Sequence, residues 1–149
     1  MSRKYASRRH NIVEALVTAL KSIDGSGAFL SNVGENVHPR MKFWDEVEEF
    51  PAIHLNAGSE ARQYQTAGYK DRFLTVTIRC YVSEEDAQIA LGALLEDVET
   101  VLEKHSKLTY FDSTFTKNSA HQITIISIDT DEGVLEPLGI GEMVREVRY

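Results

Sequence analysis

Hydrophobic positions recur at two spacings along the chain, and these spacings divide it into predicted helices and strands. Residues 12–23 carry an apolar side chain at every third or fourth position, which is typical of a helix that buries one face. Residues 83–104 repeat this pattern over about 20 positions, enough to cover a whole sheet. The two buried faces are predicted to consist of Ile12, Val13, Leu16, Val17, Leu20 and Ile23, and of Leu91, Leu94, Leu95, Val98, Val101 and Leu102.

Capping residues set the predicted start of each helix. For the first helix, either Ser7 or Asn11 can act as the N-cap, and Asn11 opens a capping-box sequence. We favour Asn11, because the basic residues before it then stay away from the positive end of the helix dipole. Residues 1–10 would form a mobile basic arm. Ser83, with Asp86 three residues later, is the predicted cap of the second helix.

Alternating patterns predict two strands in the first half of the chain. Residues 52–57 form a short strand with Ile53 on one face and His54 on the other. Residues 72–82 alternate without interruption, and one of their faces is predicted to lie in the core. That face consists of Leu74, Val76, Ile78, Cys80 and Val82.

The remaining segments have weaker patterns. Residues 58–71 resemble an exposed loop or the tip of a long hairpin. Residues 122–129 read as a strand that either is covered on both faces or contains a bulge. Glycines at 133, 139 and 141 predict a turn-rich stretch before a last strand over residues 143–149. Residues 28–50 have no clear periodicity beyond a short strand near Val37.

This order of elements predicts one domain over residues 1–149 with an α/β (α+β) fold. We expect a mostly antiparallel mixed sheet packed against two main helices, with a long loop or hairpin between the strands. A chain of 149 residues fits a single core, because two smaller cores would each offset chain entropy poorly.

Composition and charge narrow the function classes. The chain is 42% hydrophobic and 26% charged, as ordinary globular proteins are. Its formal charge of −7 disfavours general binding to a nucleic-acid backbone. No run approaches the roughly 20 apolar residues needed to cross a bilayer. The basic first residues lack the apolar stretch of a secretory signal, so we expect synthesis inside the cell.

The residues with reactive or metal-binding side chains form no known motif. Cys80 lies on the predicted core face, where burial suppresses the reactive thiolate. The five histidines lack the spacing of a zinc site. Asp129 and Asp131 resemble the start of a calcium loop, but the other ligands are missing. We therefore expect no catalytic residue, no metal and no cofactor.

What remains is surface suited to contacts with other proteins. Tyrosine and arginine supply contact area and directional hydrogen bonds at interfaces. They occur in the polar 58–71 segment, at Arg72 directly after it and in the last strand, although an ordinary exposed loop and sheet edge would have the same composition. The candidates are Arg62, Tyr64, Tyr69, Arg72, Arg145, Arg148 and Tyr149.

Taken in order, several short segments give the chain a family resemblance. Together with the two helices and the long alternating strand, they resemble the tail terminator, or tail-completion, proteins of long-tailed bacteriophages. The resemblance spans nearly the whole chain. The segments are Asn36-Val37-His38, Phe50-Pro51-Ala52-Ile53-His54-Leu55, Gly58-Ser59-Glu60, Cys80-Tyr81-Val82 and Val147-Arg148-Tyr149.

The resemblance implies a structural virion protein and not an enzyme. It implies a homo-oligomer, a six-membered ring that caps the finished tail tube, stops its polymerisation and offers a surface for head joining. The partners would be the tail tube protein and a head-tail connector protein, with DNA passing through the channel without specific binding and no membrane. The location would be the head-proximal end of the tail, after assembly in the host cytoplasm.

On this basis we expect the seven tyrosine and arginine candidates to form the subunit interface. A ring of this kind needs a head-to-tail contact that closes. We also expect a set of carboxylates to face the channel, where like charge prevents DNA from sticking. These carboxylates are Asp129, Asp131, Glu132 and Glu136.

Three alternatives remain open from the sequence. One is a different head-tail connector or neck subunit of a phage. Another is a small-ligand-binding α/β module whose pocket lies beside His54, Arg79 and Tyr81. The third is an enzyme that uses His54 or His121 with Glu60, although no nucleophile or metal motif accompanies these residues.

Overall fold

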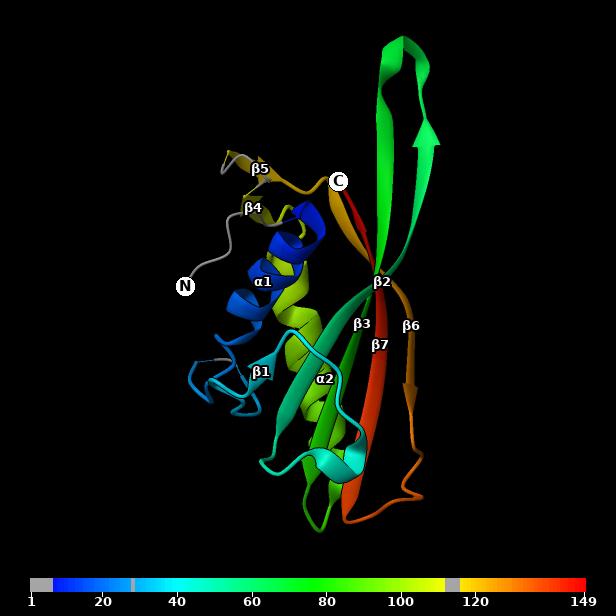
Figure 1. Cartoon of the computed structure of the whole chain (residues 1–149). Coiled ribbons are helices and arrows are strands. Elements are labelled where there is room, and N and C mark those ends of the chain that lie inside the picture. The colour runs from blue at the N-terminus through cyan, green and yellow to red at the C-terminus, as the bar shows by residue number, and fades with distance from the viewer. Residues whose placement is uncertain (1–6, 28, 112–115) are drawn as a thin grey trace.

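A computed structural model describes residues 7–27, 29–111 and 116–149 (Figure 1). Residues 1–6 of the predicted basic arm lie outside the described residues. In chain order the elements are α1 (Arg8–Leu20), β1 (Val37–His38), η1 (Trp44–Glu46), β2 (Ala52–Tyr64), η2 (Thr66–Gly68), β3 (Lys70–Ser83), α2 (Ala87–Lys104), β4 (Thr109–Phe111), β5 (Lys117–Ser119), β6 (Gln122–Thr130) and β7 (Leu138–Arg148).

The main sheet has the strand order β1-β2-β3-β7-β6. Only β1 runs parallel to its neighbour, and the other three pairings are antiparallel. Both helices pack on the same face of this sheet, α1 against β2 and α2 against β3 and β7 (Figure 1). The predicted α+β fold, a mostly antiparallel mixed sheet against two helices, is confirmed.

The core forms between the helices and the face of the sheet that they cover. All predicted positions of both helical stripes are buried, and so is the predicted core face of β3. Cys80 is fully buried on that face, and burial raises the pKa of its thiol to about 12. The strand over residues 122–129 takes the bulged alternative, with a register shift between Ile125 and Ser127. Ile126, at the bulge, is therefore 56% exposed.

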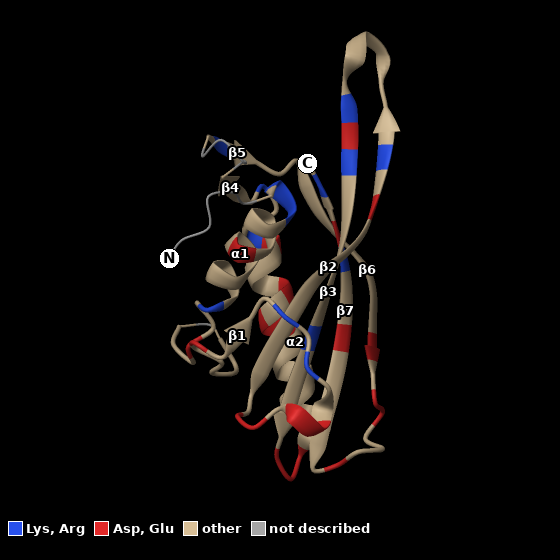
Figure 2. Cartoon of the chain, in the orientation of Figure 1, with Lys and Arg blue, Asp and Glu red and all other residues tan. Residues whose placement is uncertain are grey.

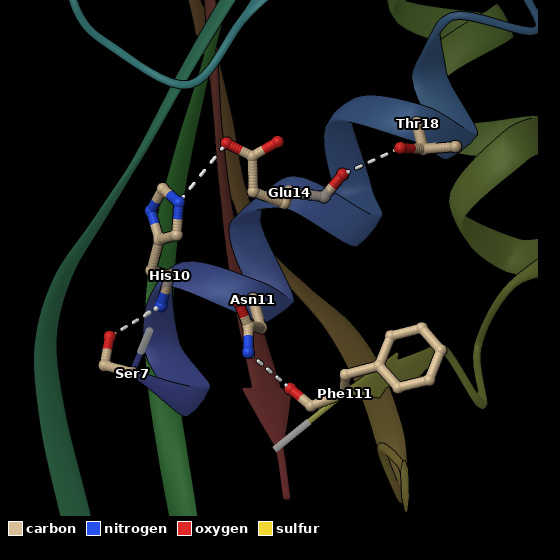
Figure 3. A network of polar contacts seen from close by, with 6 residues as sticks. All are labelled: Ser7, His10, Asn11, Glu14, Thr18 and Phe111. Atoms are coloured by element: carbon tan, nitrogen blue, oxygen red, sulfur yellow. Dashed lines mark hydrogen bonds and ion pairs between the residues drawn. The ribbon is translucent and has the colours of Figure 1, made fainter. Parts of the chain in front are cut away.

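For the first helix the favoured cap, Asn11, is wrong and the alternative, Ser7, is confirmed, whereas the predicted cap of the second helix, Ser83, is wrong. The helix α1 begins at Arg8, and the Ser7 side chain caps it by accepting a hydrogen bond from the His10 backbone N–H (Figure 3). The N-cap is therefore Ser7 and not Asn11, and residues 8–10 are helical. Ser83 is the last residue of β3, and α2 begins only at Ala87, because pairing with β7 extends the strand as far as Ser83.

The predicted turn at Gly139 and Gly141 is also wrong, since both residues belong to β7. They lie where α2 crosses the sheet. A Cβ atom at Gly139 would be 2.8 Å from a methyl carbon of Val82, and one at Gly141 would be 3.1 Å from a methyl carbon of Leu91. These glycines are therefore explained by close packing of a helix on a strand, and not by a turn.

One buried carboxylate ties the loop after α1 to the helix layer. Asp97 of α2 is only 2% exposed. It accepts hydrogen bonds from the backbone N–H of Leu30 at 3.0 Å and of Ser31 at 2.8 Å, and from the Ser31 hydroxyl at 2.5 Å. Among its described residues this loop has no helix or strand of its own beyond an isolated bridge, so Asp97 supplies a polar anchor for it.

The opposite face of the sheet is partly covered by the segment between β1 and β2. The Tyr81 hydroxyl donates to the backbone carbonyl of Lys42 at 2.7 Å, and His54 Nδ1 lies 2.9 Å from the carbonyl oxygen of Arg40. This segment continues into η1, which begins at Trp44, so η1 follows directly on the part of the chain held over the open side of the sheet.

Candidate interaction surfaces

The hairpin between β2 and β3 projects from the body of the molecule as an arm (Figure 1). Its strands pair from Glu60 and Leu74 outward to Tyr64 and Lys70, beyond a register shift after Ala57. A bulge of this kind bends a strand and increases its twist, which fits the departure of the arm from the body. The segment expected as a loop or hairpin tip is therefore a paired hairpin.

The tip of the arm presents two tyrosines to solvent. Tyr64 and Tyr69 are each 74% exposed, on either side of the η2 turn. The seven residues 63–69 carry no charge in a chain that is 26% charged. Arg62, just below the tip, forms an ion pair with Glu60 at 3.0 Å. The tip is thus an uncharged aromatic surface on an extended support.

The C-terminal residues brace the base of this arm. Tyr149 is 6% exposed and exchanges two backbone hydrogen bonds with Arg72, at 2.8 and 3.0 Å. Its hydroxyl donates to Glu60, and the guanidinium of Arg72 lies 5.8 Å from the centre of its ring. Arg148 forms an ion pair with Asp71 at 3.3 Å. Three of the predicted interface residues therefore hold the arm in place.

Charge and burial at the brace shift two pKa values. Burial raises the pKa of Tyr149, and the neighbouring Glu60 carboxylate raises it further. For Glu60, burial alone would raise the pKa, but the hydrogen bonds from Tyr149 and Arg62 outweigh burial and lower it. Glu60 therefore stays ionised and holds both donors.

Arg145 is not part of an exposed surface, contrary to the expectation for the last strand. Alternation along β7 points its side chain toward α2, where it is 2% exposed. Its Nε donates to the sulfur of Met143 at 3.1 Å, and one terminal nitrogen has no hydrogen-bond partner among the described residues. Burial lowers its pKa, which the carboxylates of Glu99 and Glu103 partly offset.

The four acidic residues expected at a channel lie at the end of the sheet opposite the arm. Two other acidic turns, residues 43–51 and 83–87, reach the same end, because Ala52, Tyr81 and Ile140 pair side by side across the sheet (Figure 2). With residues 129–137, these turns contain eleven acidic residues and no Lys or Arg. The rest of the chain holds sixteen basic and twelve acidic residues. Charge is therefore segregated along the molecule.

A groove of about 850 Å³ lies between α1 and the segment from Lys104 to Phe111. At one end the Asn11 side chain donates to the Phe111 carbonyl at 2.7 Å, which joins the two walls (Figure 3). Its walls include Ala15, Ala19 and Leu108. The sequence pattern did not reveal this groove, since it depends on how a helix and a distant β-strand meet.

The proposed small-molecule site beside His54, Arg79 and Tyr81 is occupied by the chain itself. His54 and Tyr81 form hydrogen bonds with the backbone carbonyl oxygens of Arg40 and Lys42, respectively. Arg79 forms an ion pair with Glu142 at 2.9 Å. Burial lowers the pKa of His54, and nearby cationic side chains lower it further. These side chains hold a loop on the sheet instead of opening a pocket.

His54 and Glu60 of the proposed enzyme site do not come together. His54 and Glu60 lie six positions apart on β2, which corresponds to about 20 Å along a strand. Glu60 is engaged by Tyr149 and Arg62. Among the residues that the structure describes, no group of three or more His, Cys, Asp and Glu side chains could hold a metal ion. None of the described helices is long and apolar enough to span a membrane.

Residues 6–149 match the family described as "Bacteriophage Tail Tube Terminator Protein". The chain belongs to this family. It is 34% identical over 150 residues to the tail tube terminator protein p142 of Escherichia phage T5, which covers 95% of this chain and 92% of that protein. The predicted resemblance to phage tail terminators is confirmed, and the chain is a structural tail-completion protein of the virion.

A solved structure supports the fold of this terminator. A chain from the virion of a native gene transfer agent particle superimposes with a TM-score of 0.54, at 12% sequence identity. The match covers 92% of this chain and 96% of that one. At this identity the similarity concerns the fold, and it includes nearly the whole molecule.

Proposed function

We propose that this terminator forms a closed six-membered ring that caps the completed tail tube, ends its polymerisation and offers the surface for head joining. Its partners are then the tail tube protein on one side and a head-tail connector protein on the other. The protein acts by contact alone, without catalysis. Membership in the terminator family is the observation that carries this proposal.

The arm is the element best suited to join neighbouring subunits. A ring needs two different surfaces on each copy, one that reaches out and one that receives. The tip with Tyr64 and Tyr69 reaches beyond the body and has no core to cover. Arg62 lies on the same projection, whereas Arg72, Arg148 and Tyr149 contribute by fixing its direction. The proposal does not include Arg145, whose side chain is buried.

The acidic end supports a second part of the proposal. In the ring, Asp129, Asp131, Glu132 and Glu136 face the channel. Carboxylates repel phosphate, so DNA passes without being held. Replacing these four residues with their amides should leave ring formation unchanged while DNA added to assembled rings becomes retained.

Native mass, measured by light scattering over a concentration series with and without tail tubes, tests the ring. We expect a closed hexamer in solution or on tubes. Changing both Tyr64 and Tyr69 to serine should abolish it without altering the thermal unfolding of the monomer, since both side chains are exposed. Ile89→Ser is the matched control, because Ile89 is 75% exposed on α2. An unchanged assembly mass in the tyrosine variant would remove the arm from the interface.

A further inference from the structure

The segment after β1 exposes a cluster of aromatic and acidic side chains, which we call the aromatic loop (residues 43–49). Phe43 is 72% exposed and Trp44 is 51% exposed. Tryptophan is among the residues that contribute most to protein interfaces, and on average it is highly buried in folded proteins. Four exposed carboxylates follow within five positions, and none forms an ion pair with a described residue: Asp45, Glu46, Glu48 and Glu49.

The groove beside α1 complements the aromatic loop, since it offers apolar side chains and two lysines. Its interior includes the apolar side chains of Ala15, Ala19 and Leu108. Lys104 and Lys107 lie along one wall, and neither forms an ion pair within the described ranges 7–27, 29–111 and 116–149. The lining also includes the carboxylate of Glu14, which lies 3.4 Å from His10. Single pockets of 300–1,000 Å³ enclose ligands of drug size, so about 850 Å³ accommodates two aromatic side chains.

The two surfaces lie on opposite layers of the molecule. The aromatic loop is carried by the segment that Tyr81 and His54 hold on the open face of the sheet. The groove belongs to the helix layer on the other face. One copy therefore presents the loop on one side and the groove on the other, which is the arrangement that a head-to-tail contact requires.

We propose that the aromatic loop of one copy docks in the groove of a neighbouring copy. Phe43 and Trp44 enter the apolar part of the groove, and the carboxylates of the loop pair with Lys104 and Lys107. This contact adds a second element to the proposed ring and rests on that proposal. It also gives a role to residues 43–49, which belong to a segment for which the sequence indicated none.

Charge favours the aromatic loop over the arm tip as the segment that fills the groove. Residues 63–69 carry no charge, so the arm would cover Lys104 and Lys107 without pairing them, and covering an unpaired ammonium group is costly. The aromatic loop supplies four carboxylates for two lysines. Two different projections, the arm and the aromatic loop, would then use different receiving surfaces.

A charge exchange tests the pairing. Changing Lys104 and Lys107 to glutamate should raise the concentration at half-assembly at least about tenfold, as should changing Asp45 and Glu48 to lysine. A chain with all four changes should assemble again, because the two introduced lysines then face the two introduced glutamates. Loss of assembly in this four-fold variant, with circular dichroism unchanged, would overturn the pairing.

The apolar part is tested by Phe43→Ser and, separately, Trp44→Ala. Each should raise the half-assembly concentration by about tenfold or more, while Ile89→Ser, an equally exposed apolar position, should not. Most of the Phe43 side chain is exposed to water, so Phe43→Ser should keep the monomer fold even if Trp44→Ala loses it. Assembly that is unaffected by Phe43→Ser would overturn the proposal.

A disulfide between copies locates the contact directly. Cys80 is fully buried, so introduced cysteines react without interference. One protein carries Phe43→Cys and the other carries Thr18→Cys on the groove wall; mixed under mild oxidation, they should form a mixed disulfide. Thr66→Cys at the arm tip is the control partner for Thr18→Cys. Cross-linking from Thr66 and not from Phe43 would assign the groove to the arm instead.

The outcomes separate this inference from the proposed ring. A wild-type hexamer that tolerates all loop and groove variants leaves the ring intact and removes the loop contact. A wild-type protein that stays monomeric at every concentration and in the presence of tail tubes removes both.

Discussion

Replacing Asp97 with alanine removes the polar anchor of the loop after α1. The carboxylate accepts three hydrogen bonds from Leu30 and Ser31 and is 2% exposed. Hydrogen bonds to a charged group contribute about 1.5–3 kcal/mol each, and part of this is recovered when the freed loop is hydrated. We therefore expect the free energy of unfolding to fall by about 3 kcal/mol. For a chain of this size, that corresponds to a thermal midpoint about 6–12 °C lower.

Urea and thermal unfolding followed by circular dichroism measure this loss. Glu96→Ala is the matched control, because Glu96 is the preceding residue on α2 and is exposed. Asp97→Asn should lie between the two, since an amide keeps one acceptor but places an NH₂ group against backbone donors. The reasoning is refuted if Asp97→Ala and Glu96→Ala differ by less than about 0.5 kcal/mol, the usual range for surface substitutions.

Two further predictions concern glycine and histidine. Gly139→Ala should lower the free energy of unfolding in urea by about 1–3 kcal/mol, because the new Cβ would lie 2.8 Å from Val82. Gly92→Ala on α2 is the control: its Cβ would have nothing within 4 Å, so it should raise the free energy of unfolding by up to about 1 kcal/mol. Equal effects would contradict the packing argument. Burial lowers the pKa of His54 in the folded protein, so on acidification the unfolded chain binds a proton at His54 before the folded chain does. The free energy of unfolding should therefore fall as the pH drops below about 6.5, the ordinary pKa of histidine. His54→Gln should flatten this pH dependence, and the exposed His121→Gln should not.

Local patterns predicted the elements that meet the core, because burial on one face imposes a period that the sequence records. The stripes of α1 and α2 and the alternation of β3 are the clearest cases. The bulge in β6 was one of two explanations for a break in alternation. In each case the signal lies within one segment.

Features that depend on two distant segments were not predicted. Gly139 and Gly141 read as turn residues because the helix that crosses them is about 45 positions away. Arg145 read as a surface residue because nothing local shows that α2 covers it. The groove arises in the same way. Phe43 and Trp44 did carry a usable signal, since two aromatic residues stand beside four acidic ones in a segment without periodicity.

The brace at the base of the arm has a consequence for when a ring can form. A two-stranded ribbon outside a core is only marginally stable, so the arm keeps its shape chiefly where Tyr149 and Arg148 hold it. Ordering the tip costs backbone entropy that a single encounter in dilute solution offsets poorly. On a template that gathers several copies, the effective concentration is high enough to offset it. In the proposed ring, a finished tube would thus lower the subunit concentration at which the ring closes.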